Sequence, residues 1–196
     1  TGRTNAIAVI APWVSRWFFS AVIEGVQEVL SACGYDLMLY PFGVDGELDA
    51  RALTKRVDGV LALNVPLAHR AIEGLDDLGV PIVTVGTAME GISAVLVDNV
   101  AVGRQATQHL LDLGHRRIAF FGSETEENRR FTVASDRQRG YHDALRAAGI
   151  EPDPELSFPT DFSINGGEAA LHRSVGRFGP SADRPTAVFA VSDEVA

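Results

Sequence analysis

The stretch AIAVIAPWVSRWFFSAVIEGVQEVLSACGYDLMLY, residues 6–40, decides the fold of this chain. It begins with an apolar run at residues 6–11 and ends with a second one at 37–40, and each run predicts a buried strand. Between them, apolar residues recur at helical spacing over residues 18–33, and Gly34 follows as a helix stop. A strand, a helix and a strand in this order predict a parallel βαβ unit.

The same alternation continues to the end of the chain. Further strands are predicted over residues 59–63, 81–85, 94–97, 117–122, 156–159 and 186–191. Helices are predicted over 48–55, 68–78, from Asp98 or Asn99 to Leu113, from Ser135 or Asp136 to Ala148, and over 166–175, with a polar loop at 123–130. Nearly continuous apolar strands are typical of parallel sheets that are buried on both sides. The predicted fold class is therefore α/β, with parallel sheets and helices on both faces.

Composition limits the possible functions. The 196 residues are 46% hydrophobic, which is enough for one large domain or two small lobes. The net charge of −9 argues against direct DNA binding by this segment, because phosphate-binding surfaces are basic. Cys33 is the only cysteine, so an intrachain disulfide is excluded, and its apolar surroundings predict a buried side chain. No apolar run approaches the roughly 18 residues of a membrane span, and no signal peptide precedes the first strand. The cytosol is the expected location, although a mature periplasmic protein would also lack its signal.

Aromatic residues gather just after the first predicted strand. In open α/β sheets, ligands bind outside the carboxyl ends of the strands, so residues at these positions are candidates for a site. Trp13, Trp17, Phe18 and Phe19 lie there. An aromatic side chain at this place can stack on the apolar face of a ligand, or it can pack in the core. The first interpretation is preferred for Trp13, and the two are equally weighted for Phe18.

Polar residues follow the later strands. One of Asp98 and Asn99 is expected to cap a helix while the other faces the ligand cleft. Arg137 is predicted in the first turn of its helix, where a cation is unfavourable, so an acidic partner or a hydroxyl-rich ligand should compensate. A structural ion pair is the alternative. Phe162 follows the strand at 156–159, and Asp193 follows the last strand, where it could accept a ligand hydroxyl or merely begin a helix.

Signs of catalysis are weak. The histidines lack metal-ligand spacing, and the chain has no nucleophile elbow, phosphate-binding glycine loop or dinucleotide fingerprint after its first strand. We therefore predict a binding protein that is not an enzyme and that uses neither a cofactor nor a metal ion.

Several motifs in register resemble the LacI/GalR family of transcriptional repressors. They are VDNVAVG at 97–103, LGHRRIAF at 113–120, RQRGYHDAL at 137–145, TAVFAVSDEVA at 186–196, and IAVIAP at 7–12 with Phe18 and Phe19 following. The resemblance runs over essentially the whole chain in the expected order.

This resemblance implies a two-lobed fold like that of periplasmic binding proteins, with an effector in the interlobe cleft. Residues 1–5 would be the remnant of a hinge, 6–98 the N-terminal lobe, and 99–196 a C-terminal lobe that is incomplete at its end. The family's pocket positions fall on Trp13, Phe18, Phe19, Asp98, Arg137, Phe162 and Asp193. In such proteins the arginine matching Arg137 grips ligand hydroxyls, and the aromatic residue matching Phe162 stacks on the ligand.

The sequence departs from the family at one wall of that pocket. The family often has an acidic residue in place of Trp13 and Asn-Pro in place of Arg16-Trp17. These differences argue against ordinary hexose recognition. Elsewhere, the stretch between Gly43 and Asp58 is shorter than usual, which predicts that the second helix is clipped or partly missing.

The resemblance predicts the effector-binding and dimerisation core of a cytoplasmic, homodimeric LacI-type repressor. It would sense a small molecule, such as a sugar or related polyol, and alter the operator affinity of a helix-turn-helix domain outside this chain. A periplasmic sugar-binding protein of a transport system is the alternative, and an enzyme of the Rossmann-like class is a third possibility.

Overall fold

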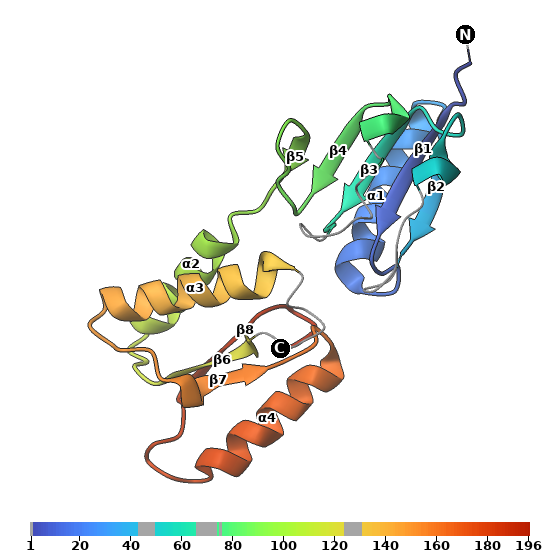
Figure 1. Ribbon diagram of the computed structural model, residues 1–196. Helices are drawn as coiled ribbons and strands as arrows, with labels where there is room; N and C mark the ends of the chain where they lie inside the picture. The colour runs from blue at the N-terminus through green and yellow to red at the C-terminus, as the bar shows by residue number, and fades with distance from the viewer. Residues whose placement is uncertain (1, 43–49, 66–73, 75, 124–130) are drawn as a thin grey trace. The chain divides into compact units, whose positions relative to one another are not determined.

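The computed structural model describes residues 2–42, 50–65, 74, 76–123 and 131–196. They form two compact units that divide between Val97 and Asp98, and Figure 1 shows the elements of each. None of the helices in these ranges has the length and apolar character that a membrane span requires. Each unit is built on its own parallel sheet, as the sequence predicts.

Unit 1 contains a five-stranded parallel sheet in the order β2-β1-β3-β4-β5. The strands are β1 (Ala6–Ala11), β2 (Asp36–Pro41), β3 (Gly59–Leu63), β4 (Ile82–Val85) and β5 (Ser93–Val95), and the helix α1 spans Trp17–Ala32. The predicted strand-helix-strand unit is confirmed, because α1 connects β1 to the parallel strand β2. The strand predicted at residues 94–97 is β5, which ends at Val95, and Leu96 and Val97 lie beyond it and are exposed.

The two faces of this sheet are covered differently. Ala8 and Ile10 of β1 face a cluster that includes Leu53, whereas Val9 and Ala11 face α1 and its buried Phe19. The alternation follows from the two-residue period of a strand. The apolar face of α1 was predicted to begin at Phe18, but it begins one residue later. Phe19 is 5% exposed and packs on the sheet, whereas Phe18 is 41% exposed.

Three other expectations for unit 1 are changed. The helix expected at 48–55 is a 3-10 helix over Ala50–Leu53 in its described part. The helix expected at 68–78 lies outside the described residues except for residue 74 and the short 3-10 helix Asp76–Leu78. Cys33 is exposed and not buried, because it is the C-cap of α1 and lies beyond the part of the helix that packs on the sheet.

A carboxylate holds the start of unit 1. The side chain of Asp58 accepts hydrogen bonds from the backbone N–H of Thr4 at 2.8 Å, from the Thr4 hydroxyl at 2.9 Å and from the backbone N–H of Asn5 at 3.0 Å. The bond from the Thr4 backbone is the main cause that lowers the pKa of Asp58. Asp58 therefore anchors the residues that lead into β1.

Unit 2 contains a three-stranded parallel sheet in the order β7-β6-β8. Its elements are α2 (Asn99–Asp112), β6 (Ile118–Ser123), α3 (Thr132–Ala147), β7 (Ser157–Pro159), α4 (Ile164–Phe178) and β8 (Ala187–Ala190). Helices α2 and α3 lie on one face of this sheet and α4 on the other (Figure 1). The loop expected at 123–130 lies outside the described residues, apart from Ser123 at the end of β6.

Tyr141 lies at the centre of the unit 2 core. Its ring is fully buried and stacks on Phe120 at 5.4 Å between centroids, and Phe120 contacts Phe189 edge-on at 5.3 Å. The Tyr141 hydroxyl donates a hydrogen bond to the backbone carbonyl of Ile118 at 2.8 Å. Tyr141 thus ties the inner face of α3 to β6, and burial raises the pKa of its hydroxyl to about 12.

This buried hydroxyl predicts a loss of stability in alkali. A tyrosine in the unfolded chain ionises near pH 10, whereas Tyr141 in the folded chain ionises near 12. The stability that depends on its neutral form is therefore complete below about pH 10 and is lost as the pH rises to about 12. Tyr141→Phe should cost about 1 kcal/mol at neutral pH and make the alkaline decline shallower. Urea unfolding between pH 7 and 12 measures both effects, with Tyr35→Phe in unit 1 as the control, and an unchanged alkaline slope would contradict the assignment.

Candidate functional site

The site in unit 2 is set by a close crossing of α2 and α3. A Cβ built on Gly103 would overlap the backbone carbonyl of Arg137, and one built on Gly140 would overlap the backbone carbonyl of Val100. Only glycine allows two helix backbones to approach so closely at both positions. The crossing brings Asn99, one turn before Gly103, beside Arg137, which lies one turn before Gly140.

Arg137 is held by two acceptors from different elements. Its Nε–H donates to the side-chain Oδ1 of Asn99 at 3.0 Å, and its Nη1 donates to the backbone carbonyl of Val191, just after β8. Burial lowers the pKa of Arg137, and the negative charge of Asp193 acts in the opposite direction. The guanidinium is therefore fixed in its plane near the carboxyl end of β8, where ligands bind in open α/β sheets.

The reason given for Arg137 from the sequence needs correction. Helix α3 begins at Thr132 and not at Ser135 or Asp136, so Arg137 lies in its second turn, where the helix dipole acts weakly. The ion pair proposed as an alternative is not found among the described residues, because both hydrogen-bond acceptors of Arg137 are neutral oxygens and Asp193 acts on it only through its charge. The position of Arg137 near the carboxyl end of β8 follows instead from the close crossing of α2 and α3 at Gly103 and Gly140.

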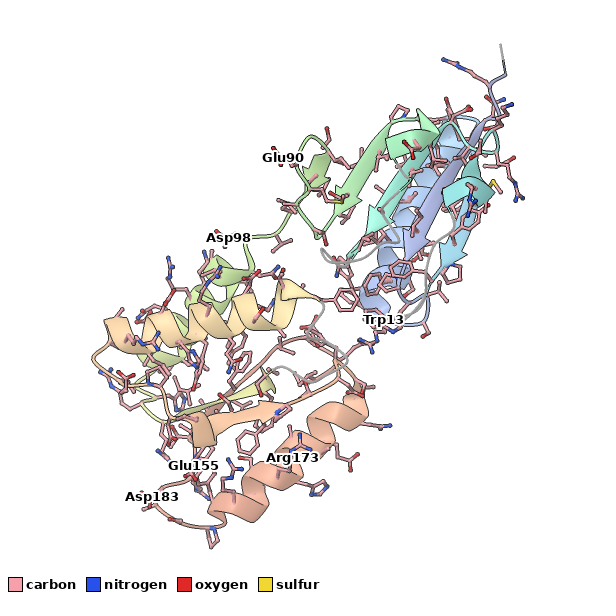
Figure 2. The ribbon with its side chains drawn as sticks, viewed as in Figure 1. Trp13, Glu90, Asp98, Glu155, Arg173 and Asp183 are labelled. Carbon is pink, nitrogen blue, oxygen red and sulfur yellow. The ribbon has the colours of Figure 1, made fainter. Side chains whose placement is uncertain are left out.

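Asp98 and Asn99 divide two tasks at the start of α2. Asp98 is exposed and caps the helix, because its Oδ1 accepts the backbone N–H of Ala101 at 2.9 Å. Figure 2 labels Asp98 at this helix start. Asn99 is the residue that contacts Arg137. The expectation that one residue of this pair caps the helix is confirmed, and the placement of Asp98 among the effector-binding residues stays a prediction. The signal that could have identified Asn99 is its spacing of one turn from Gly103.

The end of β8 adds further polar groups. Asp193 is exposed and interacts electrostatically with Arg137. The Ser192 side-chain oxygen is buried and has no hydrogen-bond partner among the described residues. A buried polar oxygen without a partner is costly, so it is a candidate for contact with a bound ligand. From the sequence, Asp193 and not Ser192 was chosen as the candidate at the end of this strand.

Phe162 occupies a strained turn after β7. Its φ angle of 60° lies in the left-handed region, which is uncommon for a non-glycine residue. The side chain is half-buried and packs against the unit 2 core. The preceding Asp161 accepts a hydrogen bond from the Ser163 hydroxyl at 2.6 Å, and Ser163 in turn caps α4. Strained backbone of this kind concentrates at functional sites.

In unit 1, the predicted aromatic residues separate into buried and exposed ones. Phe19 is in the core, and Trp13 is half-buried and packs against it with centroids 5.5 Å apart. The guanidinium of Arg16 lies over the Trp13 ring at 3.8 Å, which is a cation–π contact. Phe18 and Trp17 are 41% and 61% exposed. Figure 2 shows Trp13 at the turn between β1 and α1.

Metal binding has no support in the described part of the chain. No group of three or more histidine, cysteine, aspartate or glutamate side chains there is arranged to hold an ion. The arrangement at Arg137 offers hydrogen-bond donors and acceptors, which suits recognition of a polar ligand.

Comparison with known proteins identifies the family of this chain. The family model for "periplasmic binding proteins and sugar binding domain of LacI family" matches residues 4–196. The HTH-type transcriptional regulator CelR of Thermobifida fusca is 34% identical over 205 residues, covering 98% of this chain and 58% of the relative. The HTH-type transcriptional repressor CytR of Escherichia coli strain K12 is 29% identical, covering 99% of this chain and 56% of the relative.

Solved structures give the same result. The structure of a transcriptional regulator CelR–cellobiose complex aligns with a TM-score of 0.80 at 32% identity, covering 98% of this chain and 60% of that one. The transcription regulator CcpA of Lactococcus lactis aligns with a TM-score of 0.77 at 27% identity, covering 98% and 70%. The chain thus spans a little over half the length of its curated relatives. The predicted resemblance is confirmed, and the chain belongs to the family of periplasmic binding proteins and LacI-type sugar-binding domains.

Proposed function

We propose that this chain is the effector-sensing part of a LacI-type transcriptional regulator and that its effector is a carbohydrate. The observation that carries the proposal is the orientation of Arg137 at the carboxyl end of β8, where three of its five N–H donors are not used by the described contacts. A guanidinium fork suits vicinal hydroxyls. Asp193 supplies an acceptor and Ser192 a hydroxyl, and both directly follow Val191, whose carbonyl binds Arg137.

Two further groups of residues are proposed as effector contacts. Phe162 is proposed to stack on a sugar ring in unit 2, and Asp98 to complete the polar surface. From unit 1 we propose Trp13, Phe18 and Phe19, of which Trp13 and Phe18 have ring surface that a ligand can reach and Phe19 supports Trp13 from the core.

Regulation in this proposal depends on the whole protein. The relatives are named as HTH-type regulators, and we propose that this chain works in a cytoplasmic homodimer that binds an operator through a helix-turn-helix domain outside residues 1–196. We propose no catalytic activity. The effector must bind the two conformations of the protein with different affinity, because equal affinity for both would shift nothing.

Cellobiose is the first ligand to test, since the structural relative CelR was solved in complex with it. Thermal-shift and calorimetric titrations of this chain with cellobiose, other disaccharides and monosaccharides should identify a sugar that binds. The same sugar should change the affinity of the full-length regulator for DNA selected in vitro by about 5- to 150-fold. Sugar binding without any DNA binding by the full-length protein would favour the transport-type alternative, and no binding of any sugar would contradict the proposal.

A further inference from the structure

We propose that Asn99 is a positioning residue that orients Arg137 for the effector and links the state of this arginine to the start of α2. The inference rests on the proposed function, because it assigns a role at the same site. It goes further because it names the residue that orients Arg137. It also names a route by which a ligand bound to Arg137 affects the start of α2.

The first part of the argument is geometric. An arginine side chain has several rotatable bonds, and one hydrogen bond leaves its plane free to turn. Arg137 has two bonds, one from Nε to Asn99 of α2 and one from Nη1 to the carbonyl of Val191. Acceptors on two different elements fix both the position and the plane of the guanidinium. An arginine ordered before the ligand arrives binds more tightly, because less side-chain freedom is lost on binding.

The chemistry of a carboxamide is the second part. Asn99 Oδ1 accepts the Nε–H bond without adding a negative charge beside the cation. A carboxylate at this position would form an ion pair and compete with the ligand for the guanidinium. The carboxylate next to it, Asp98, is engaged with the backbone of Ala101. The Asp-Asn pair therefore caps the helix with one side chain and orients the arginine with the other.

The place of Asn99 in the chain is the third part. It is the first residue of α2 and lies two residues after Val97, the last residue of unit 1. A ligand that binds the guanidinium in its fixed position also favours this position of Asn99, at the segment where the chain passes from one unit to the next. By linkage, a change in that segment alters ligand affinity by the same factor.

Three variants test this role: Asn99→Ala, Asn99→Asp and the control Asn165→Ala. Asn165 is exposed near the start of α4 and so matches the helix-start position of Asn99. With cellobiose as the calorimetric probe, Asn99→Ala should raise Kd about tenfold, as expected for loss of one hydrogen bond to a charged group, whereas Asn165→Ala should stay within twofold.

A second readout needs no ligand. In protein labelled with nitrogen-15, the Nε–H resonance of Arg137 should exchange with water faster in Asn99→Ala than in the wild type. Asn99→Asp, which keeps an oxygen acceptor, should restore slow exchange, and Asn165→Ala should leave it unchanged. An asparagine that only supports the start of α2 without holding Arg137 would not produce this pattern, and the change in Kd shows that the held arginine serves the ligand.

The outcomes separate this inference from the proposed function. If the wild type binds cellobiose or another sugar of the panel and Asn99→Ala binds it equally well with unchanged Nε–H exchange, the positioning role is wrong. If the wild type binds no sugar, the proposed function fails, while the exchange of Arg137 Nε–H still decides whether Asn99 holds the arginine.

Discussion

Arg137→Ala is expected to abolish sugar-induced stabilisation of this chain while leaving it folded. The variant removes the donors that would bind ligand hydroxyls, and hydrogen bonds to a charged group contribute about 1.5–3 kcal/mol each, so the affinity should fall by at least about 100-fold. It also leaves the side chain of Asn99 and the carbonyl of Val191 without this donor. We expect a cost of about 1–3 kcal/mol in the free energy of unfolding for that reason.

The measurement is a thermal shift with and without saturating sugar, together with urea unfolding of the free protein. Arg139→Ala is the matched control, because Arg139 lies on the same helix and is exposed, with an ion pair to Asp136 at 3.2 Å. Exposed pairs of this kind contribute at most about 1 kcal/mol. Sugar binding of wild-type strength in Arg137→Ala would refute our assignment of the site.

Gly140→Ala is expected to destabilise unit 2 by about 2–3 kcal/mol, despite the higher helix propensity of alanine. Alanine would ordinarily stabilise the middle of a helix by about 1 kcal/mol relative to glycine. At position 140, however, its Cβ would overlap the backbone of α2 at Val100 and Arg104. Backbone atoms cannot rotate away as a side chain can, so the two helices must separate, and Asn99 should lose its contact with Arg137.

Gly176→Ala is the control for this prediction. Gly176 lies in α4, and a Cβ there meets nothing within 4 Å. The substitution should therefore leave stability unchanged or raise it by up to about 1 kcal/mol. Denaturant unfolding measures both variants, and sugar titration should show weaker binding in Gly140→Ala alone. Equal stability of the two variants would show that the crossing of α2 and α3 is less tight than described.

The strands were predictable because their signal is local. Runs such as residues 6–11 and 59–63 are apolar throughout, and the structure has strands with these bounds. The register of α1 was less predictable, because the segment begins with Phe18 and Phe19 side by side and either could start the apolar stripe. The choice depends on how the helix lies against β1, which is tertiary information.

The start of α3 illustrates a second limit. Ser135 and Asp136 are good capping residues, yet the helix begins at Thr132 after Phe131, which makes no side-chain capping bond. Phe131 is buried, so packing of this end outweighs capping preference.

The candidate site was predictable only in part. Arg137 was proposed from its place after a strand, but its partners could not be predicted from the sequence, because Asn99 lies 38 residues away and Val191 lies 54 residues away. The glycines that bring them together are ordinary in isolation. They matter only together, because Gly103 lies against the backbone of α3 and Gly140 against the backbone of α2.

The anchor at Asp58 determines how far any segment joined ahead of β1 can reach. Because Thr4 and Asn5 are bound to a side chain beside β3, a tether attached there starts from a fixed point and not from a loose end. The reach of a flexible tether of n residues grows as about 5–6 Å × √n, so each residue freed from the anchor lengthens it. Breaking the anchor would thus widen the volume searched by an attached domain and lower its effective concentration at a target of fixed spacing.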